Sequence, residues 1–168
     1  KDFLCSEHNI THEELSEFVR TAPNRYKVYT IPKRTIGHRT IAHPAKQLKA
    51  YQRSLNKFLS EILPVHHSAY AYRKGLGIKE NATQHLSSRY LLKMDFQNYF
   101  NSITPKLFWY SIDRLDIEFS LSEKHLLEKL LFWCPTKKMG GKLVLSVGAP
   151  SSPLISNFIA HQFHAHTC

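Results

Sequence analysis

Hydrophobic residues recur along this chain at two different spacings, which together predict a mixture of helices and strands. The clearest helical pattern runs from Lys46 to Leu63, and Pro64 stops it. Its apolar positions are Leu48, Tyr51, Leu55, Phe58, Leu59 and Ile62. Its opposite face carries Lys49, Arg53 and Lys57. The pattern therefore predicts a helix with one side buried in a core and a basic side facing outward.

A β-hairpin is expected before this helix. Tyr26–Ile31 alternates and is rich in β-forming residues, and Arg39–Ala42 is a second short extended run. Residues 32–38, which join the two runs, begin with a proline and contain a glycine, a composition typical of a turn. The turn also carries Lys33 and Arg34, so the hairpin is predicted to present cations at its tip.

Local patterns predict the remaining elements. Thr11 and Glu14 have the arrangement of a capping box, which predicts a helix to about Arg20. Further helices are expected at residues 78–87, 104–115, 122–133 and 154–165. Strands are expected at residues 91–95 and 142–146, the second of them after a Gly-Gly turn.

The strand at residues 91–95 ends in a carboxylate. Leu91, Leu92 and Met94 form an apolar run that would place Asp95 at the carboxyl end of a buried strand. A carboxylate there costs free energy unless a positive charge compensates it, and a bound divalent cation would do so. The alternative is an Asp that caps the following turn. The run by itself leaves both interpretations open.

Composition and charge indicate a folded domain with a polyanionic partner. Of the 168 residues, 42% are hydrophobic and 12% aromatic, which excludes a disordered chain and allows a sizeable core. The net charge is +10, and no acidic residue lies between Glu17 and Glu61. The cations in that stretch are Arg20, Arg25, Lys27, Lys33, Arg34, Arg39, Lys46, Lys49, Arg53 and Lys57. Such a block favours nucleic acid, because each phosphate contact releases a counterion; a solvated basic face is the alternative.

Other partners and compartments receive less support. A membrane surface is less favoured, because the basic block does not form one continuous amphipathic helix. Cys5, Cys134 and Cys168 form no CxxC pair, so neither a disulfide framework nor a zinc ribbon is indicated, and a reducing cytosol fits. No apolar run reaches transmembrane length and no signal peptide opens the chain. Both ends of the sequence are interpreted as cuts.

Two segments in the first half resemble parts of a retron-type bacterial reverse transcriptase. The basic hairpin Tyr26–Ile41 resembles the fingertip strands that close on an incoming nucleotide. Asn81-Ala-Thr-Gln-His85 matches the NAxxH element that marks retron enzymes. In this family Asn81 and His85 would belong to the recognition of a structured RNA.

Two segments in the second half extend the resemblance. Lys93-Met-Asp95 with Phe100 is similar to palm motif A. Leu145-Ser-Val-Gly-Ala-Pro-Ser-Ser-Pro153, followed by Leu154-Ile-Ser-Asn157, is similar to motif B. The resemblance covers roughly Tyr26 to Asn157, and motif B preceded by motif A is its specific part.

The resemblance implies an α+β fold, the fingers and partial palm of a right-hand polymerase, lacking the second half of the palm and the thumb. It divides the chain into an N-terminal helical extension at residues 1–24 and a fingers region at residues 25–90. The fingers hold the basic hairpin, the long helix and the NAxxH element. Residues 91–168 form the partial palm with motifs A and B.

The implied activity is RNA-directed DNA synthesis by two-metal nucleotidyl transfer. Asp95 would be the catalytic carboxylate and a Mg²⁺ ligand, with the backbone carbonyl of Phe96 as a second contact. Asp113 and Asp116 are expected to face solvent instead. Phe100 would lie beneath the sugar of a deoxynucleotide and exclude a ribose 2′-hydroxyl; core packing is the alternative for this ring.

Lys33 and Arg39 are the candidates for triphosphate contact. The Lys ammonium is a mobile point charge, and the Arg guanidinium can bind phosphate with two hydrogen bonds at once. Arg34, assigned to nucleic acid, is a close rival of Lys33 because hairpin register cannot be read from sequence. Val147 and Gly148 would lie at the nucleotide, with Val147 standing where many family members carry Gln. Gly148, Ala149 and Pro150 would let the backbone approach the base pair and template.

Arg73, Lys74 and Arg89 are candidates for lining a template groove, with Tyr70 or Tyr72 stacking on a base. An ordinary loop with exposed cations is the alternative. The terminal His161, His164, His166 and Cys168 fit no common zinc spacing, and a cut helix end is the preferred interpretation.

One carboxylate cannot hold two metals, and the chain contains no Asp-Asp pair. The chain is therefore interpreted as an amino-terminal fragment of a cytoplasmic polymerase, inactive alone. The implied partners are a structured RNA template and primer, an RNA–DNA hybrid, deoxynucleoside triphosphates and, in a role in phage defence, an effector protein, with no membrane. The alternatives are a non-catalytic RNA-binding module derived from a reverse transcriptase and a maturase-type or template-independent relative, against which the NAxxH element argues.

Overall fold

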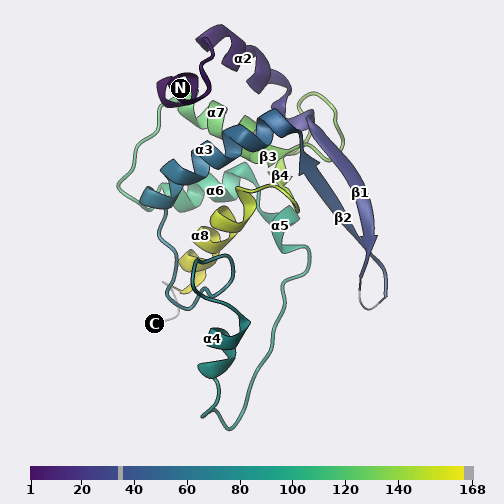
Figure 1. The fold of residues 1–168 in the computed structure, drawn as a ribbon, viewed down its shortest axis with the longest axis vertical. Coiled ribbons are helices and arrows are strands. Elements are labelled where there is room, and N and C mark those ends of the chain that lie inside the picture. The colour runs from purple at the N-terminus through teal and green to yellow at the C-terminus, as the bar shows by residue number, and fades with distance from the viewer. Residues whose placement is uncertain (34–35, 165–168) are drawn as a thin grey trace.

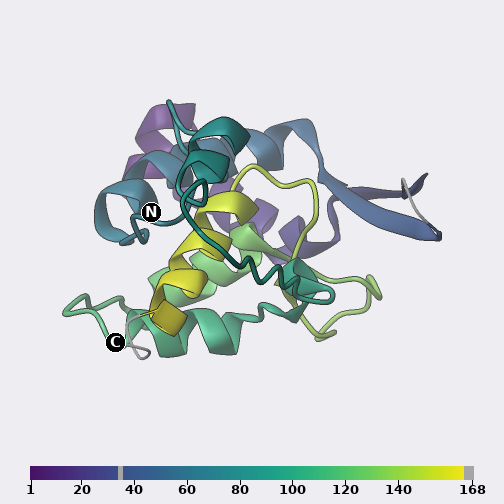
Figure 2. The same ribbon diagram turned by 90° about the horizontal axis from the view of Figure 1, so that it is seen from below.

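The computed structural model describes residues 1–33 and 36–164, with side chains as far as residue 162. A helical body carries a two-stranded hairpin that projects to one side (Figures 1 and 2). A loop-rich extension, residues 64–98, lies below the body in the view of Figure 1. The elements are α1 (Asp2–His8), α2 (His12–Thr21), the 3-10 turn η1 (Ala22–Asn24), β1 (Tyr26–Pro32), β2 (His38–Pro44), α3 (Lys46–Ile62), α4 (Ile78–Thr83), α5 (Tyr99–Ser102), α6 (Pro105–Ile112), α7 (Leu121–Leu131), β3 (Phe132–Trp133), β4 (Val144–Leu145) and α8 (Ser152–His164).

The capping-box helix is confirmed. The Glu14 backbone N–H donates to the Thr11 hydroxyl at 3.1 Å, and the Thr11 N–H donates to the Glu14 carboxylate at 2.8 Å. The helix runs to Thr21, one residue beyond the expected end. The short helix α1 before it was not expected from the sequence.

The hairpin is also confirmed, and it is longer than predicted. Strands β1 and β2 pair antiparallel from Tyr26 opposite Pro44 to Pro32 opposite His38. The Lys33 N–H continues the ladder by donating to the Gly37 carbonyl at 2.9 Å. Only the base of the hairpin is buried, so most of its two faces are open to solvent.

The long helix α3 buries the predicted stripe at Leu48, Tyr51, Leu55 and Leu59. Phe58 departs from the prediction, since it is 41% exposed. It lies at the edge of the stripe, and the polar residue Gln52 is buried instead.

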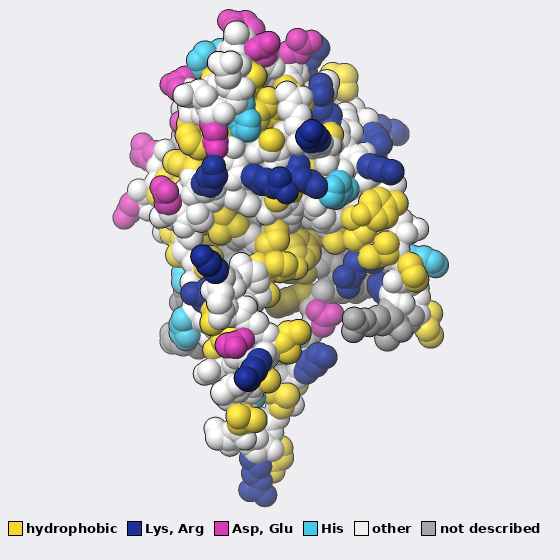
Figure 3. Space-filling model, in the orientation of Figure 1, with side chains coloured by type: hydrophobic (Ala, Val, Ile, Leu, Met, Phe, Trp, Pro, Cys, Tyr) yellow, Lys and Arg dark blue, Asp and Glu magenta, His cyan; other side chains and the backbone are white. Residues whose placement is uncertain are grey.

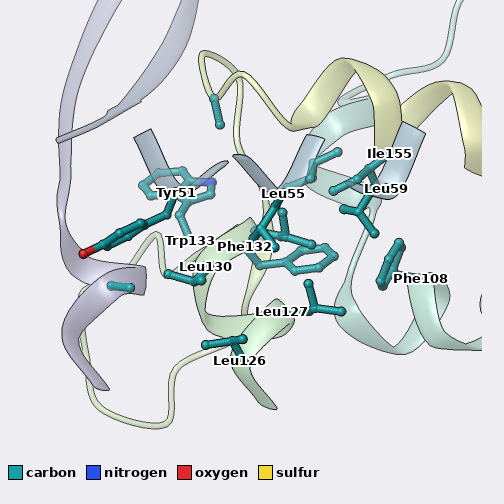
Figure 4. Close-up of a cluster of buried hydrophobic side chains, with 14 of the residues drawn as sticks. Tyr51, Leu55, Leu59, Phe108, Leu126, Leu127, Leu130, Phe132, Trp133 and Ile155 are labelled. Carbon is teal, nitrogen blue, oxygen red and sulfur yellow. The ribbon is translucent and has the colours of Figure 1, made fainter. Parts of the chain in front are cut away.

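The core joins the helical body to the short strands, as Figure 4 shows. Phe108 of α6 makes edge-on contacts with Phe132 of β3 and Phe158 of α8, at ring-centroid distances of 5.9 and 6.2 Å. Leu130 of α7 and Leu59 of α3 are fully buried in the same cluster. The apolar faces of four helices therefore meet in one core, as the periodicity of the sequence requires.

The prediction of a strand at residues 91–95 is wrong. The segment has no regular structure, and its side chains at Leu91, Leu92 and Met94 are 69%, 80% and 81% exposed. Among the described residues only β1–β2 and β3–β4 form sheets, so this segment has no neighbouring strand to accept its backbone hydrogen bonds. An apolar run without a ladder partner does not form a strand.

Other expected elements are shortened. The strand at 142–146 is reduced to β4, which pairs with β3, and the helix at 78–87 ends at Thr83. The helix at 104–115 ends at Ile112, and the one at 122–133 gives way to β3 after Leu131. Within the described ranges no helix has both the length and the apolar character needed to cross a membrane.

Gln52 connects three elements at the base of the hairpin. Its amide donates to the Tyr26 hydroxyl of β1 at 3.0 Å and to the Leu130 carbonyl of α7 at 2.8 Å. Both Gln52 and Tyr26 are buried, and burial raises the pKa of the Tyr26 phenol, so its hydroxyl stays neutral and accepts the bond.

We expect Gln52→Ala to lower the free energy of unfolding by about 1–3 kcal/mol, because it leaves a buried hydroxyl and a buried carbonyl without their donor. Urea denaturation measures this loss. The exposed Gln84 provides the control, since Gln84→Ala should change stability by less than about 0.5 kcal/mol. Equal stability of the two variants would show that the Gln52 bonds do not hold the hairpin to the body.

Candidate nucleotide and nucleic-acid site

The hairpin brings two predicted phosphate-binding cations to one face. Side chains alternate along a strand and directly paired residues share a face. Arg39 lies opposite Ile31, and Lys33 follows Ile31 by two positions. Lys33 and Arg39 therefore project from the same face, and both are exposed. Arg34, the rival of Lys33, lies outside the described residues.

The loop after β4 is bound to the edge of β2. The Ala42 N–H donates to the Val147 carbonyl at 2.9 Å, and the buried Ser146 hydroxyl donates to the Ala42 carbonyl. A side chain on Gly148 would meet Ile41 Cγ2 at 3.1 Å and the Ala42 carbonyl oxygen at 3.2 Å. Gly148 thus lies against Ile41. Ile41 is two residues from Arg39 on the same face of β2, so Ile41 and Arg39 are separated by about 7 Å along the strand.

Two further bonds fix this loop. The Asn56 amide of α3 donates to the Pro150 carbonyl at 2.8 Å, and the Leu145 N–H donates to the Ile103 carbonyl at 2.9 Å. Ala149 is buried and Pro150 is half-buried between them. Sequence reasoning missed Asn56 and Ser146. The signal for Asn56 was an amide four residues after Gln52, on a helix whose neighbouring positions are apolar.

Helix α5 brings Phe100 to the same region. The Tyr99 hydroxyl donates to the Ser156 carbonyl of α8 at 2.7 Å, and burial raises the pKa of this phenol to about 12. Phe100 is half-buried and packs against the edge of the core. Because Ile103, which follows α5, accepts a hydrogen bond from Leu145, the helix that carries Phe100 lies beside β4, the strand that leads into the loop of Val147 and Gly148. Both the sugar-contact and the core-packing interpretations remain compatible with this position.

Asp95 is exposed and does not occupy the end of a buried strand, which corrects the expectation for it. Its neighbour Phe96 stacks on Tyr99, with ring centroids 5.4 Å apart. The segment that carries Asp95 is therefore anchored at α5, although the strand is absent. Figure 3 shows a hollowed surface beside the hairpin with Lys and Arg side chains along its border.

The described residues do not complete a metal site. No group of three or more His, Cys, Asp or Glu side chains among them is arranged to hold a metal ion. Asp95 with the Phe96 carbonyl supplies too few oxygen ligands for a pair of magnesium ions. Asp113 and Asp116 face solvent as expected, and Asp113 lies 3.8 Å from the Lys124 ammonium.

Of the terminal residues considered for a metal, only the His161 side chain is described. His161 is half-buried, with its ring 5.9 Å from that of His66, which in turn lies 4.1 Å from His67. The side chain of His164, and His166 and Cys168 altogether, lie outside the described part of the chain.

A basic groove runs along the base of the hairpin and the first turns of α3. It has a volume of about 760 Å³ and is lined by Arg25, Lys27, His43, Lys46, Lys49 and Arg53, among others. The Lys49 ammonium lies 2.6 Å from the His43 ring. Figure 3 shows Lys and Arg side chains in a row over this part of the surface. The concentration of cations suits a phosphate backbone.

Lys57, at the far end of the basic face of α3, is engaged differently. Its ammonium lies 2.7 Å from the Glu7 carboxylate of α1, and this hydrogen bond holds the pKa of Glu7 below its usual value. The stretch without acidic residues is therefore partly neutralised by a helix that precedes it, whereas no groove cation has an ion-pair partner among the described residues.

The remaining nucleic-acid candidates lie on the extension below the body. Arg73 donates to the carbonyls of His66, His67 and Ala69 at 3.1–3.4 Å, so it closes its own loop, which favours the structural alternative for this residue. Lys74, Asn81 and His85 are exposed.

The aromatic candidates in this extension differ in exposure. Tyr72 is 69% exposed and Tyr70 is half-buried, which makes Tyr72 the better stacking platform. Arg89 lies over the ring of its neighbour Tyr90, with its guanidinium 5.5 Å from the ring centroid.

Comparison with known proteins gives a consistent result. The sequence model of the family described as "Reverse transcriptase (RNA-dependent DNA polymerase)" matches residues 31–167. The Retron Ec83 reverse transcriptase of Escherichia coli is 49% identical over 138 residues, which cover 82% of this chain and 44% of that protein. The Retron Ec73 reverse transcriptase of the same organism is 36% identical over 152 residues, 88% of this chain and 46% of that protein.

A more distant relative extends the range of organisms. The Retron Mx65 reverse transcriptase of Myxococcus xanthus is 31% identical over 152 residues, 83% of this chain and 35% of that protein. The chain spans less than half the length of each of these curated relatives.

The close approach of Gly148 to β2 predicts a specific instability. Gly148→Ala would force a methyl group against Ile41 and the Ala42 carbonyl at a backbone φ of +122°, and we expect a loss of about 1–3 kcal/mol in the free energy of unfolding. Gly75→Ala is the matched control, since Gly75 also has a positive φ, +79°, but has open space around it. Equal losses by urea denaturation would show that the contact with β2 adds nothing beyond backbone strain.

Proposed function

The chain belongs to the reverse transcriptase (RNA-dependent DNA polymerase) family, and on this basis we propose that it forms the part of a retron-type polymerase that holds the incoming deoxynucleotide and the template. Lys33 and Arg39 contact the triphosphate. Gly148 and the backbone around it approach the nascent base pair, and Phe100 lies beneath the deoxyribose. The RNA that is copied follows the basic groove at the base of the hairpin.

One observation carries this proposal. The bonds of Ala42 to residues 146–147 hold the loop at the edge of β2, and Gly148 there approaches Ile41, which shares a strand face with Arg39, although Gly148 and Arg39 are far apart in the sequence. A triphosphate requires a cation, and a flat base pair requires a stretch of backbone without a side chain. Arg39 and Gly148 would supply the two on one face.

Asp95 is the carboxylate that we assign to the chemistry. In nucleotidyl transfer of this family Mg²⁺ stabilises the charge on the attacking and leaving oxygens. Asp95 and the Phe96 carbonyl alone do not provide such a site, so no catalytic step is assigned to the 168 residues by themselves. We propose that the isolated chain binds an RNA–DNA hybrid without extending it.

The lack of a metal-holding group of acidic side chains among the described residues favours a second function. A reverse-transcriptase scaffold whose described residues offer one exposed carboxylate at this face, without a metal-holding group, could serve only to bind RNA. In this alternative the hairpin and groove bind the backbone, and Asp95 has no catalytic role.

A chimera separates the two functions. Residues 1–157 are fused to the part of the Retron Ec83 reverse transcriptase that follows its matched stretch, and DNA synthesis on a primed RNA homopolymer is measured with Mg²⁺. We expect the chain alone to give no product and the chimera to extend the primer. Asp95→Asn should lower extension by at least about 100-fold, because an electrostatic group acting in the transition state is lost.

The controls use residues away from the proposed site. Asp116→Asn removes an exposed carboxylate of the same kind and should leave extension within about twofold of the unsubstituted chimera. Robust product from residues 1–168 alone would overturn the proposed inactivity. Equal activity of the Asp95→Asn and Asp116→Asn chimeras would remove Asp95 from the chemistry, and a chimera that binds the hybrid without extending it would favour the RNA-binding alternative.

A further inference from the structure

A second cavity lies outside the site described above. It has a volume of about 650 Å³, is open to solvent, and is bordered by α2, η1, α7 and the loop at residues 134–143. None of the nucleotide-site residues lines it. The volume is within the range of pockets that take one small molecule or one nucleotide, and it is too small for a helix or a duplex.

The walls of this cavity are cationic. The cations Arg20 of α2, Lys129 of α7 and Lys138 of the loop line it beside the His125 ring, and no Asp or Glu occurs among its described lining residues. Cationic side chains from three separate segments around one cavity favour an anionic group, because a single ligand anion would relieve their mutual repulsion.

The rim and floor of the cavity are apolar. Leu121 and Met139 at its rim are 87% and 95% exposed, while Leu126 and Val19 in its floor are buried. Exposed large apolar side chains beside cations fit a ligand with both a flat apolar part and an anionic part. A nucleotide has both, in its base and its phosphate.

The loop that carries Lys138 and Met139 is built tightly. A side chain on Gly141 would lie 2.6 Å from the Cys134 sulfur and 2.7 Å from the Thr136 hydroxyl. The Cys134 N–H donates to the Pro23 carbonyl at 2.9 Å, which ties the loop to η1. The turn therefore holds Lys138 and Met139 at the mouth of the cavity by backbone contacts.

Asn24 connects the cavity to the basic groove. It lines both, and its side-chain oxygen is buried without a hydrogen-bond partner among the described residues. A buried amide oxygen without a donor costs free energy, which a ligand N–H would recover. The exocyclic amino groups of adenine, cytosine and guanine are donors of this kind.

From these features we propose that the cavity between α2, α7 and the 134–143 loop binds one unpaired nucleotide of the RNA that occupies the basic groove. Arg20 and Lys129 contact the phosphate, and the base lies against Met139 and Leu126. The inference rests on the proposed RNA binding and adds a recognition site for the RNA outside the nucleotide site. A free nucleotide has the same chemistry, so the test below separates the two sources.

The test uses the chain with 4-thiouridine-substituted single-stranded RNA, ultraviolet cross-linking and mass-spectrometric mapping of the modified peptides. We expect cross-links on peptides of the 134–143 loop as well as on the hairpin. In parallel, Arg20→Gln/Lys129→Gln should weaken RNA binding about tenfold at 0.1 M salt. The slope of log affinity against log salt should fall by about 0.7, as for one phosphate that is no longer neutralised on a single strand.

Lys106→Gln/Arg114→Gln is the matched control, because it also removes one Lys and one Arg. Lys106 lies on α6 and Arg114 just after it, and neither lines the cavity or the groove. This variant should change affinity by less than about twofold. Thermal unfolding of both double variants checks that they fold. Because the cross-links are mapped on the unsubstituted chain, the result does not depend on the variants.

Three outcomes are decisive. RNA binding with cross-links on the hairpin alone would overturn this inference and leave the proposed function intact, whereas no RNA binding at all would overturn both. Binding of adenosine monophosphate without RNA, lost in Arg20→Gln/Lys129→Gln, would support the cavity as a nucleotide site and assign it to a free nucleotide.

Discussion

The arrangement of the candidate site depends on a short backbone contact between two distant segments. The Ala42 N–H and carbonyl, at the edge of β2, are bonded to the Val147 carbonyl and the Ser146 hydroxyl. This contact aligns the loop at residues 146–150 with the hairpin, and the absence of a side chain at Gly148 lets the two backbones approach. Without it, Arg39 and Gly148 would belong to separate surfaces, and the face proposed for the nucleotide would not form.

Two amides of α3 transmit this alignment to the helical body. Gln52 and Asn56 lie one turn apart on α3 and bind, respectively, the base of the hairpin with α7 and the loop at Pro150. Because hydrogen bonds are directional, the bonds donated by these two amides orient the projecting elements in addition to apolar packing. The helix thus acts as the common support of both halves of the site.

Charge is distributed so that the groove and the cavity keep their cations. The acidic side chain of Glu7 is bonded to Lys57, and that of Asp113 lies near Lys124, away from the groove. The groove at the hairpin base and the cavity behind η1 have no acidic residue among their described lining residues, and Asn24 lines both. A polyanion therefore meets favourable potential on both sides of η1.

The sequence by itself determined the local elements and the residue types of the site. Helical spacing specified α3, the capping box specified α2, and alternation with a proline-containing turn specified the hairpin, because each depends on residues close together in the chain. The motifs at Asp95, Phe100 and Gly148 were recognisable for the same reason. The absence of a strand at Leu91–Asp95 could not be read from its apolar pattern, since a strand exists only when a neighbour bonds to it.

Only the tertiary structure decided which residues meet. It put Lys33 on the same face as Arg39, bonded Arg73 to its own loop, and revealed Ser146 and Asn56 as the residues that hold the loop of Gly148. It also assembled a cationic cavity from Arg20, Lys129 and Lys138, which no spacing connects. Contacts between segments far apart in the chain depend on how helices pack and strands pair, and a linear pattern does not contain that information.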